Sequence, residues 1–312
     1  MYFKEKRIKG KNYKYAVHSI RLPNGKVIPL EKRYNQENKE QLSRIFEKKE
    51  KEENAKYAIK QFGTNSIFTK DQLEKVEEIR LDYKKILKKL TKFALKDLLD
   101  RFTANFTYES NALEGNSLTL KDVSIIMFEN HAVKGKDLRE IYETRNSRNV
   151  VDLIIKNKFR ISHEDIIRMH KMLIKDIPIQ QGYKKLPNFL IGREMRTTLP
   201  ESVFEEISGL IEWHNQEKNN LHPLKLAALF HGKFEQIHPF EDGNGRVGRF
   251  LINVILIKNN YPPLIIRKSQ RMAYLKALEN FDNKHTETLQ RFMLDKFKDT
   301  YKKFFKIYVK YV

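Results

Sequence analysis

Apolar side chains recur at helical spacing along most of the chain. A stretch rich in lysine and glutamate over residues 37–61 carries only a narrow apolar face, which predicts a largely solvated helix. A second helix is expected to begin after Thr69, because Thr69 and Gln72 form a capping box, and its apolar spacing continues toward Leu90. Later helical segments are marked by the residues near which they begin: Thr119, Ser162, Pro200, Pro223 and Gly245. The pattern therefore predicts a mainly α protein.

Two short stretches alternate in the manner of β-strands instead. Near the start, residues 13–17 and 27–30 flank the turn sequence Pro23-Asn24-Gly25, which predicts a β-hairpin. The second stretch, residues 183–198, contains the apolar run Phe189, Leu190 and Ile191 before a glycine, which predicts a short hairpin flap. The expected fold class is thus mainly α, with a small β-hairpin flap and a small N-terminal region of hairpin and helix.

Charge is the strongest feature of the composition. The chain has 61 Lys and Arg residues against 40 Asp and Glu residues, a net charge of +21. Residues 1–35 form the densest basic block, in which ten basic side chains face only Glu5 and Glu31. This excess is typical of proteins that bind nucleic acid or another polyanion, and a solvated lysine-rich surface explains it equally well. No winged-helix or zinc pattern accompanies the block.

Several classes of protein are excluded by what the sequence does not contain. There is no cysteine, so disulfides, thiolate metal sites and cysteine nucleophiles are all excluded. The polar start of the chain lacks the apolar core of a signal peptide. The longest apolar stretch, residues 250–257, is far too short to span a bilayer. We therefore expect a cytoplasmic protein with no membrane partner.

One segment, His238-Pro-Phe-Glu-Asp-Gly-Asn-Gly-Arg-Val-Gly-Arg249, carries residues suited to phosphate chemistry. Gly243 and Gly245 permit backbone turns closed to other residues, and they precede a helix whose N-terminal N–H groups favour an anion. Arg246 and Arg249 lie three residues apart in the first turn of that helix, so both can clamp phosphate oxygens. Two arginines indicate a ligand with more than one phosphate.

The same loop contains a candidate metal ligand and a candidate base. Asp242 would repel a bare polyphosphate, so we interpret it as the ligand of a divalent cation, most simply Mg²⁺. His238 is the only imidazole of the loop and can accept a proton from an incoming hydroxyl. Asn244 offers amide bonds that fix the loop or contact phosphate. His170 and His214 fall on apolar helical faces and are expected in the core.

The loop resembles, without a departure, the signature H-x-F-x-[D/E]-G-N-G-R-x-x-R of the Fic family. The resemblance extends over about residues 102–292 and implies a helical bundle that transfers AMP from ATP to a Ser, Thr or Tyr hydroxyl of a target protein. A glycine at 245, where the Doc-like branch has lysine, implies nucleotidyl transfer in preference to phosphoryl transfer. The implied roles are base for His238, Mg²⁺ ligand for Asp242, α-phosphate anion hole for Gly243, Asn244 and Gly245, and β- and γ-phosphate grips for Arg246 and Arg249.

A second motif, Ser110-Asn-Ala-Leu-Glu114-Gly115-Asn116, resembles the Fic inhibitory motif [S/T]-x-x-x-E-[G/N]. A helix ending in Glu-Gly is also a common C-cap pattern, so the motif gains meaning only beside the catalytic loop. Glu114 is then expected to pair with Arg249 and remove the γ-phosphate grip, which predicts an autoinhibited ground state. Some family members remove AMP from the target with this glutamate positioning water, and that alternative stays open for Glu114.

Taken together, the resemblance and the breaks in the pattern predict three parts: a basic hairpin and helix over 1–67, a helical segment with the inhibitory motif over 68–116, and a catalytic domain over 117–312. The flap residues Phe189, Leu190 and Ile191 are expected to present an extended target segment to His238, the alternative being a cover without target contact. Expected partners are ATP, Mg²⁺ and an unidentified target protein, with self-modification and a homo-oligomer left open. The competing function is a nucleic-acid-binding regulator that uses the basic N-terminus and keeps the nucleotide site as a sensor.

Overall fold

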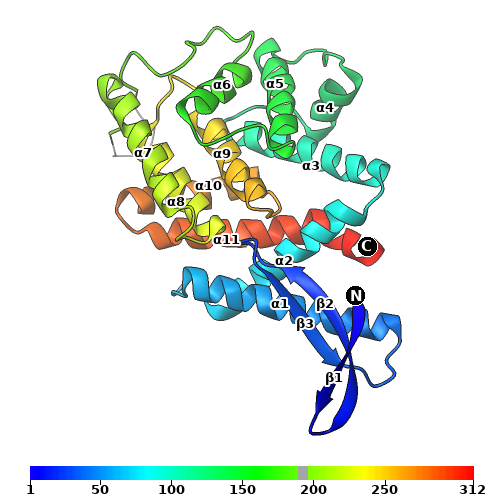
Figure 1. Cartoon of the computed structure of the whole chain (residues 1–312). Helices are drawn as coiled ribbons and strands as arrows, with labels where there is room; N and C mark the ends of the chain where they lie inside the picture. The colour runs from blue at the N-terminus through cyan, green and yellow to red at the C-terminus, as the bar shows by residue number, and fades with distance from the viewer. Residues whose placement is uncertain (189–195) are drawn as a thin grey trace. The chain divides into compact units, whose positions relative to one another are not determined.

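The computed structural model describes residues 1–188 and 196–312, and helices make up most of it (Figure 1). The chain divides into two compact units, Met1–Leu81 and Asp82–Val312. Within the described residues, strands occur only as one three-stranded sheet near the N-terminus. The expectation of a mainly α protein with a small N-terminal β region is therefore confirmed. The predicted flap residues Phe189, Leu190 and Ile191 lie outside the described residues.

The first unit begins with an antiparallel sheet in the order β1 (Tyr2–Ile8), β2 (Lys11–Arg21) and β3 (Val27–Arg33). The β2–β3 hairpin was predicted, and Ile20 lies opposite Ile28 next to its turn. Strand β1 was not predicted, because none of its seven residues is buried and its sequence lacks a clear apolar alternation.

Helix α1 (Lys39–Phe62) supplies the other side of the small core of this unit. Its Leu42 and Phe46 pack with sheet residues, among them Ala16, Ile20 and Leu30. The rest of α1 is mostly polar, as expected from its narrow apolar face. Helix α2 (Lys70–Lys89) starts after Thr69, whose hydroxyl accepts a hydrogen bond from the Gln72 N–H, and it continues past Leu81 into the second unit.

The second unit is a helical bundle. Its elements after α2 are α3 (Lys92–Leu113), α4 (Leu120–Ser124), η1 (Ile125–Glu129), α5 (Leu138–Ile155), α6 (His163–Leu173), η2 (Pro200–Ser202), α7 (Val203–Glu217), α8 (Pro223–Ile237), α9 (Asn244–Lys258), η3 (Lys268–Gln270), α10 (Arg271–Asp282), α11 (Thr286–Thr300), η4 (Tyr301–Phe305) and η5 (Lys306–Tyr311).

Helices α8 and α9 pack against each other at the centre of this bundle (Figure 1). Helix α8 also contacts α7, α10 and α11, whereas α9 contacts α3, α5 and α6. Both helices are buried along most of their length, so the short loop that joins them is supported from several sides. That loop contains the residues that the sequence singled out for phosphate chemistry.

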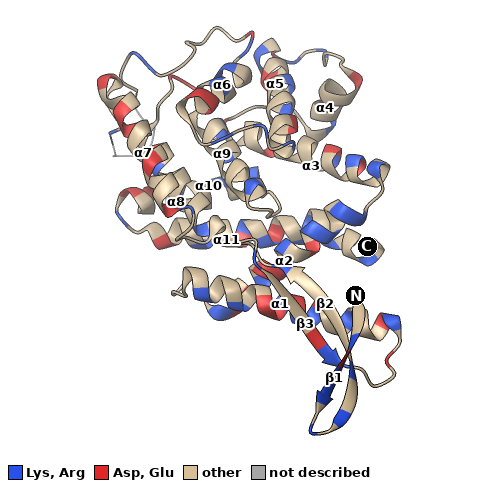
Figure 2. Ribbon diagram, in the orientation of Figure 1, with Lys and Arg blue, Asp and Glu red and all other residues tan. Residues whose placement is uncertain are grey.

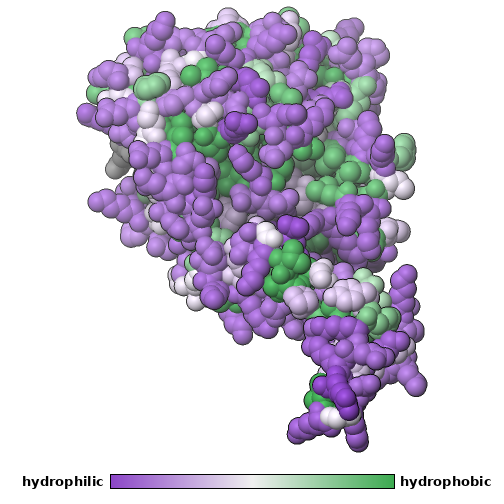
Figure 3. All heavy atoms as spheres, viewed as in Figure 1, coloured by the Kyte–Doolittle hydropathy of each residue, from purple (hydrophilic) through white to green (hydrophobic). Residues whose placement is uncertain are grey.

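The surface carries charges of both signs. Lys and Arg residues are distributed along most elements of both units, with Asp and Glu interspersed (Figure 2). On the face drawn in Figure 3, the outer helices of the second unit are mainly hydrophilic and apolar side chains show between them. No helix within residues 1–188 and 196–312 combines the length and apolar character that crossing a bilayer requires.

Gly232 marks a close contact inside the bundle and gives a prediction about stability. A Cβ at this position of α8 would lie 2.5 Å from two ring carbons of Phe281 on α10, a side chain that is itself buried. Gly232→Ala therefore forces a packed ring to move, and we expect the free energy of unfolding to fall by roughly 1–3 kcal/mol. Thermal or urea unfolding followed by circular dichroism measures the change.

The matched control is Gly209→Ala in the neighbouring helix α7. A Cβ at Gly209 meets no atom within 4 Å, so the substitution adds helix propensity without a clash. We expect Gly209→Ala to raise the free energy of unfolding by about 0.5–1 kcal/mol. A Gly232→Ala protein as stable as the wild type would contradict the close contact between α8 and α10.

Candidate active site

The loop between α8 and α9 turns sharply at two left-handed residues. His238 has φ 49° and ends α8, donating its N–H to the Phe234 carbonyl oxygen at 3.0 Å. Gly243 has φ 82° and starts α9, a conformation that suits glycine. The Asn244 side chain accepts from the Phe240 N–H and donates to the Phe240 carbonyl, both at 2.8 Å. Asn244 therefore fixes the loop, one of the two roles that the sequence left open for it.

Packing beneath the loop holds it rigidly. The Phe240 ring is fully buried and stacks on His170 of α6, with ring centroids 3.8 Å apart and planes at 4°. Burial lowers the pKa of His170 to about 4, so the imidazole is neutral near pH 7. Its Nε2 lies 3.1 Å from the Asp242 carbonyl oxygen, which accepts the hydrogen bond. His170 is thus a core residue, as expected, and it also supports the loop.

Arg246 and Arg249 project from the first turns of α9 and are both 2% exposed. Nη1 of Arg246 lies 3.1 Å from Oε1 of Glu143 on α5. Arg249 reaches α3, where its Nε donates to the Ser110 hydroxyl at 3.0 Å and its Nη2 to the Ser110 carbonyl at 2.8 Å. The two guanidinium groups that the sequence assigned to phosphate are therefore each occupied by groups of the chain itself.

Glu114 is the acidic partner of Arg249. It forms the C-cap of α3, and its Oε1 lies 2.7 Å from Arg249 Nη2. Burial disfavours the charged guanidinium, but the charge and hydrogen bond of Glu114 outweigh it and raise the pKa of Arg249. A Cβ at Gly245 would lie 2.3 Å from the same Oε1, so the glycine is needed for this close approach. The structure pairs Glu114 with Arg249, as expected, and it also brings Ser110 of the same motif to Arg249.

Asp242 is the acidic residue of the loop that the sequence assigned to a cation. Its carboxylate is 42% exposed, pairs with Arg139 of α5, and lies 3.8 Å from an Nη2 of Arg246. In phosphoryl-transfer sites Mg²⁺ is bound through one or two carboxylates together with substrate phosphates, so this single exposed carboxylate fits that ion when phosphate replaces it as the partner of the arginines. Within the part of the chain that the structure describes, no group of three His, Asp or Glu side chains is placed to hold a metal.

His238 lies at the edge of the site, with 17% of its side chain exposed. Its Nδ1 faces the preceding turn of α8, 3.9 Å from an Oε2 of Glu235. The left-handed backbone of this residue thus directs one ring nitrogen toward α8. A base in this loop needs its other nitrogen, Nε2, for an incoming hydroxyl.

The segments on either side of the undescribed residues are tied to the loop. The Lys184 N–H donates to the Pro239 carbonyl, and the Asn188 amide donates to the Phe240 carbonyl, both at 2.8 Å. The Lys184 ammonium is buried and donates to side-chain oxygens of Asn188 and Thr197. Burial lowers its pKa to about 8. Residues 184–188 and Thr197 are therefore anchored beside the candidate catalytic loop.

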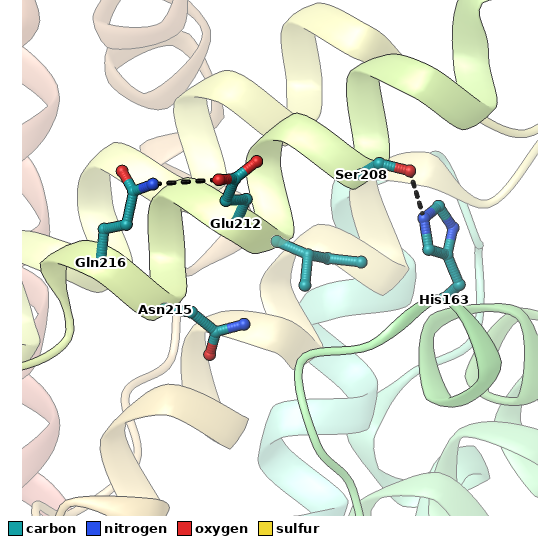
Figure 4. A pocket seen from close by; sticks show the side chains of 6 residues that line it. His163, Ser208, Glu212, Asn215 and Gln216 are labelled. Carbon is teal, nitrogen blue, oxygen red and sulfur yellow. Dashed lines mark hydrogen bonds between the residues drawn. The ribbon is translucent and has the colours of Figure 1, made fainter.

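Away from the loop, a pocket of about 490 Å³ lies between α6 and α7 (Figure 4). His163 Nε2 is 2.8 Å from the Ser208 hydroxyl, and its Nδ1 is 2.7 Å from the Tyr183 hydroxyl. Ser208 donates to the Phe204 carbonyl, so it accepts from His163, and Tyr183 then donates to Nδ1. This chain of hydrogen bonds joins α7 to α6 and to the segment that packs on Phe240.

Sequence reasoning missed three polar residues of the site. Arg139 and Glu143 come from α5, where only a helical pattern marked them, and no short motif pointed to Asp242 or Arg246 as their partners. Glu235 belongs to α8, and the available signal was a carboxylate in a helix that is otherwise mostly apolar and runs into the signature loop.

Residues 160–256 match the family model described as the Fic/DOC family, and they include the whole loop and both arginines. This segment of the chain is therefore similar to a Fic domain. Among curated relatives, protein adenylyltransferase fic-1 of Caenorhabditis elegans is 30% identical over 192 residues, and protein adenylyltransferase Fic of Drosophila grimshawi is 32% identical over 193. These alignments cover 59% and 60% of this chain but 38% and 40% of the relatives. The chain thus spans about two fifths of the length of these relatives.

Solved structures agree on the fold of the Fic domain. A Fic domain containing signaling protein from Bacteroides thetaiotaomicron superposes with a TM-score of 0.67 at 24% identity, covering 72% of this chain and 93% of that one. Fic-1 of Caenorhabditis elegans superposes with a TM-score of 0.66 at 23% identity, covering 75% and 70%. The expected helical bundle of the Fic type is therefore confirmed.

Proposed function

We propose that this chain is an autoinhibited, Mg²⁺-dependent protein adenylyltransferase, which transfers AMP from ATP to a hydroxyl of a target protein. The relatives named protein adenylyltransferase, about 30% identical over the Fic domain, support the reaction. The observation that carries the proposal is the ion pair between Glu114 and Arg249. A buried arginine at the start of α9 has a carboxylate where a terminal phosphate would bind, beside a loop with the full complement of catalytic side chains.

In this mechanism the first turn of α9 receives the triphosphate. Backbone N–H groups at Gly243, Asn244 and Gly245 would hold the α-phosphate, since helix N-termini favour anions. Arg246 would bind the β-phosphate after leaving Glu143, and Arg249 the γ-phosphate after leaving Glu114. Asp242, after leaving Arg139, would hold Mg²⁺, which when bound neutralises phosphate charge. Catalysis then rests on positioning and charge stabilisation.

His238 would supply the base. Its Nε2 removes the proton from the target hydroxyl as that oxygen forms a bond to the α-phosphorus of ATP. The bond between the α-phosphorus and the bridging oxygen breaks, and pyrophosphate leaves with the electron pair. The protein product carries AMP as a phosphodiester, and the proton remains on the imidazole until solvent takes it.

Inhibition follows from charge and space. Glu114 occupies Arg249 and lies so close to Gly245 that the triphosphate has no room to approach both groups in its productive position. Its negative charge also repels a phosphate there. Release of Glu114 from Arg249 is therefore the step that would permit transfer.

The test uses Glu114→Gly protein with Mg²⁺ and ATP labelled on either the α- or the γ-phosphate, with and without a cell lysate as a source of target proteins. We expect α-label to become protein-bound, the chain or a target to gain the mass of one adenylyl group, and pyrophosphate to appear. Chelation of Mg²⁺ should stop the reaction. Transfer of γ-label alone would identify a kinase instead, and label from neither position would reject the proposal.

The reverse reaction is the second candidate, and it too involves Glu114. Although bonded to Arg249, the Glu114 side chain is 44% exposed, so it has access to a water molecule that attacks an AMP-modified target. Wild-type protein incubated with AMP-modified target distinguishes the two. Release of AMP that depends on Glu114 would identify an eraser, and modification that persists would leave the writer as the function.

A further inference from the structure

A buried carboxylate lies behind the candidate base. Glu235 is 4% exposed on α8, one turn before His238. Its Oε2 lies 3.9 Å from His238 Nδ1, and its Oε1 lies 3.9 Å from His231 Nε2. The carboxylate thus lies between two imidazoles. The one nearer to Oε2 is that of His238, which belongs to the signature loop.

The surrounding helices leave a space shaped for this carboxylate. A Cβ at Gly248 of α9 would lie 2.8 Å from Glu235 Oε1 and 2.9 Å from the His231 ring, so any larger residue would displace both. His231 Nε2 is in turn 2.7 Å from the Tyr274 hydroxyl of α10, and the two rings stack. Gly248 of α9 and His231 of α8 therefore line the space that Glu235 occupies, and Tyr274 of α10 fixes His231.

The charged and titratable groups around Glu235 indicate what its carboxylate can do. A buried carboxylate is costly unless charged or hydrogen-bonding groups offset its desolvation. The titratable groups around it are His231 and His238 on α8, Tyr274 on α10, and Arg249 on α9, which is itself paired with Glu114 on α3. Of these, His238 is the one that becomes positively charged during the proposed reaction.

We infer that Glu235 is a positioning residue for His238: its carboxylate draws the proton of the neutral imidazole to Nδ1, so that Nε2 is the nitrogen that accepts the proton of the target hydroxyl. This inference rests on the proposed function for its catalytic consequence, but not for its geometry. A carboxylate that accepts from one ring nitrogen fixes the tautomer and orientation of a histidine and stabilises its protonated form. The separation of 3.9 Å exceeds a hydrogen bond, so in this structure the carboxylate acts through its negative charge, which favours a proton on the nearer ring nitrogen.

The first experiment needs no enzymatic activity. Nitrogen-15 NMR of histidine-labelled protein reports which ring nitrogen of each imidazole carries the proton, and the His238 signals are assigned as those absent from His238→Asn. In wild-type protein at a pH where His238 is neutral, we expect the Nδ1–H tautomer. In Glu235→Gln, we expect a larger share of the Nε2–H form and protonation of His238 at lower pH, because a negative charge has been removed. An Nε2–H tautomer in the wild type would overturn the inference.

The second experiment measures transfer in the Glu114→Gly background. We expect Glu235→Gln to lower kcat about 10- to 100-fold, the range found when the carboxylate partner of a metal-binding histidine is removed. The KM for ATP should change little, and the acid limb of the kcat profile should move to lower pH. A rise in KM with unchanged kcat and pH profile would show a merely structural role. If Glu114→Gly transfers no AMP at all, the proposed function fails, while the NMR result still decides the role of Glu235.

The control is Glu212→Gln on α7, a carboxylate that lines the pocket of Figure 4. It should change neither the His238 tautomer nor kcat. Circular dichroism and thermal unfolding check that Glu235→Gln remains folded, and if it does not, the wild-type tautomer alone still supports or overturns the inference.

Discussion

Glu114→Gly protein should transfer AMP on the order of 10- to 100-fold faster than the wild type, since a hydrogen bond to a charged group contributes about 1.5–3 kcal/mol. The substitution removes the carboxylate that lies 2.7 Å from Arg249, so the guanidinium becomes available to the γ-phosphate. It also clears the space next to Gly245. Initial rates with α-labelled ATP measure the gain, and calorimetry with ATP and Mg²⁺ should show tighter nucleotide binding.

The helix should tolerate this change. Glu114 follows the last residue of α3 and precedes Gly115, whose φ of 100° already ends the helix, so a glycine at 114 does not interrupt regular structure. Ser110 remains to hold Arg249 through its hydroxyl and carbonyl oxygens. The increase in rate would therefore come from the released guanidinium and not from unfolding of α3.

The matched control is Glu109→Gln, one turn earlier on the same helix. Glu109 also pairs with an arginine, Arg267, and it is buried, unlike Glu114. It accepts a hydrogen bond from the Lys268 N–H at 2.7 Å, away from the signature loop. The Glu109→Gln variant should transfer AMP at the wild-type rate and should have a lower thermal stability. Equal activation by Glu109→Gln and Glu114→Gly would mean that loosening α3, not freeing Arg249, raises activity.

The candidate residues that lie close together in the sequence could be found without the structure. His238, Asp242 and the two arginines belong to one loop and the helix it begins, so glycine placement and helical spacing alone bring them together. The pairing of Glu114 with Arg249 could be predicted only because each residue lies in a recognisable motif. Capping residues such as Thr119 were equally local: a helix begins there as predicted, and Thr119 forms a capping box with Asp122.

What sequence alone missed depends on tertiary packing. Nothing near Arg139 or Glu143 indicates that α5 would bring them to Asp242 and Arg246. Ion pairs between distant helices follow from how the helices cross, which periodicity does not encode. The role of Gly248 is similar, because it looks like a weak helix residue until the space it leaves for Glu235 is seen. The contacts that the sequence missed are thus those that restrain the site. The residues that the sequence identified are those proposed to carry out its chemistry.

Removing the imidazole in the activated background should abolish most of the transfer. In Glu114→Gly protein, we expect His238→Asn to lower the rate by about 10²- to 10⁴-fold, the usual contribution of a general base. Asparagine is chosen because residue 238 has φ 49°, a left-handed conformation that asparagine tolerates and alanine does not. Rates with α-labelled ATP are compared with nucleotide affinity from calorimetry, which should stay within a few-fold because the proposed phosphate ligands are untouched.

His238→Ala separates loss of the base from strain in the backbone. It should match His238→Asn in activity but unfold more easily, by about 1 kcal/mol, because alanine pays the full cost of the left-handed conformation. If both variants bind ATP and keep more than a tenth of the parent rate, the loop would not use His238 as its base, and proton removal would have to come from another group. If instead both variants lose nucleotide binding together with transfer, His238 would hold the phosphate-binding loop in place, and its proposed role as the base would be wrong.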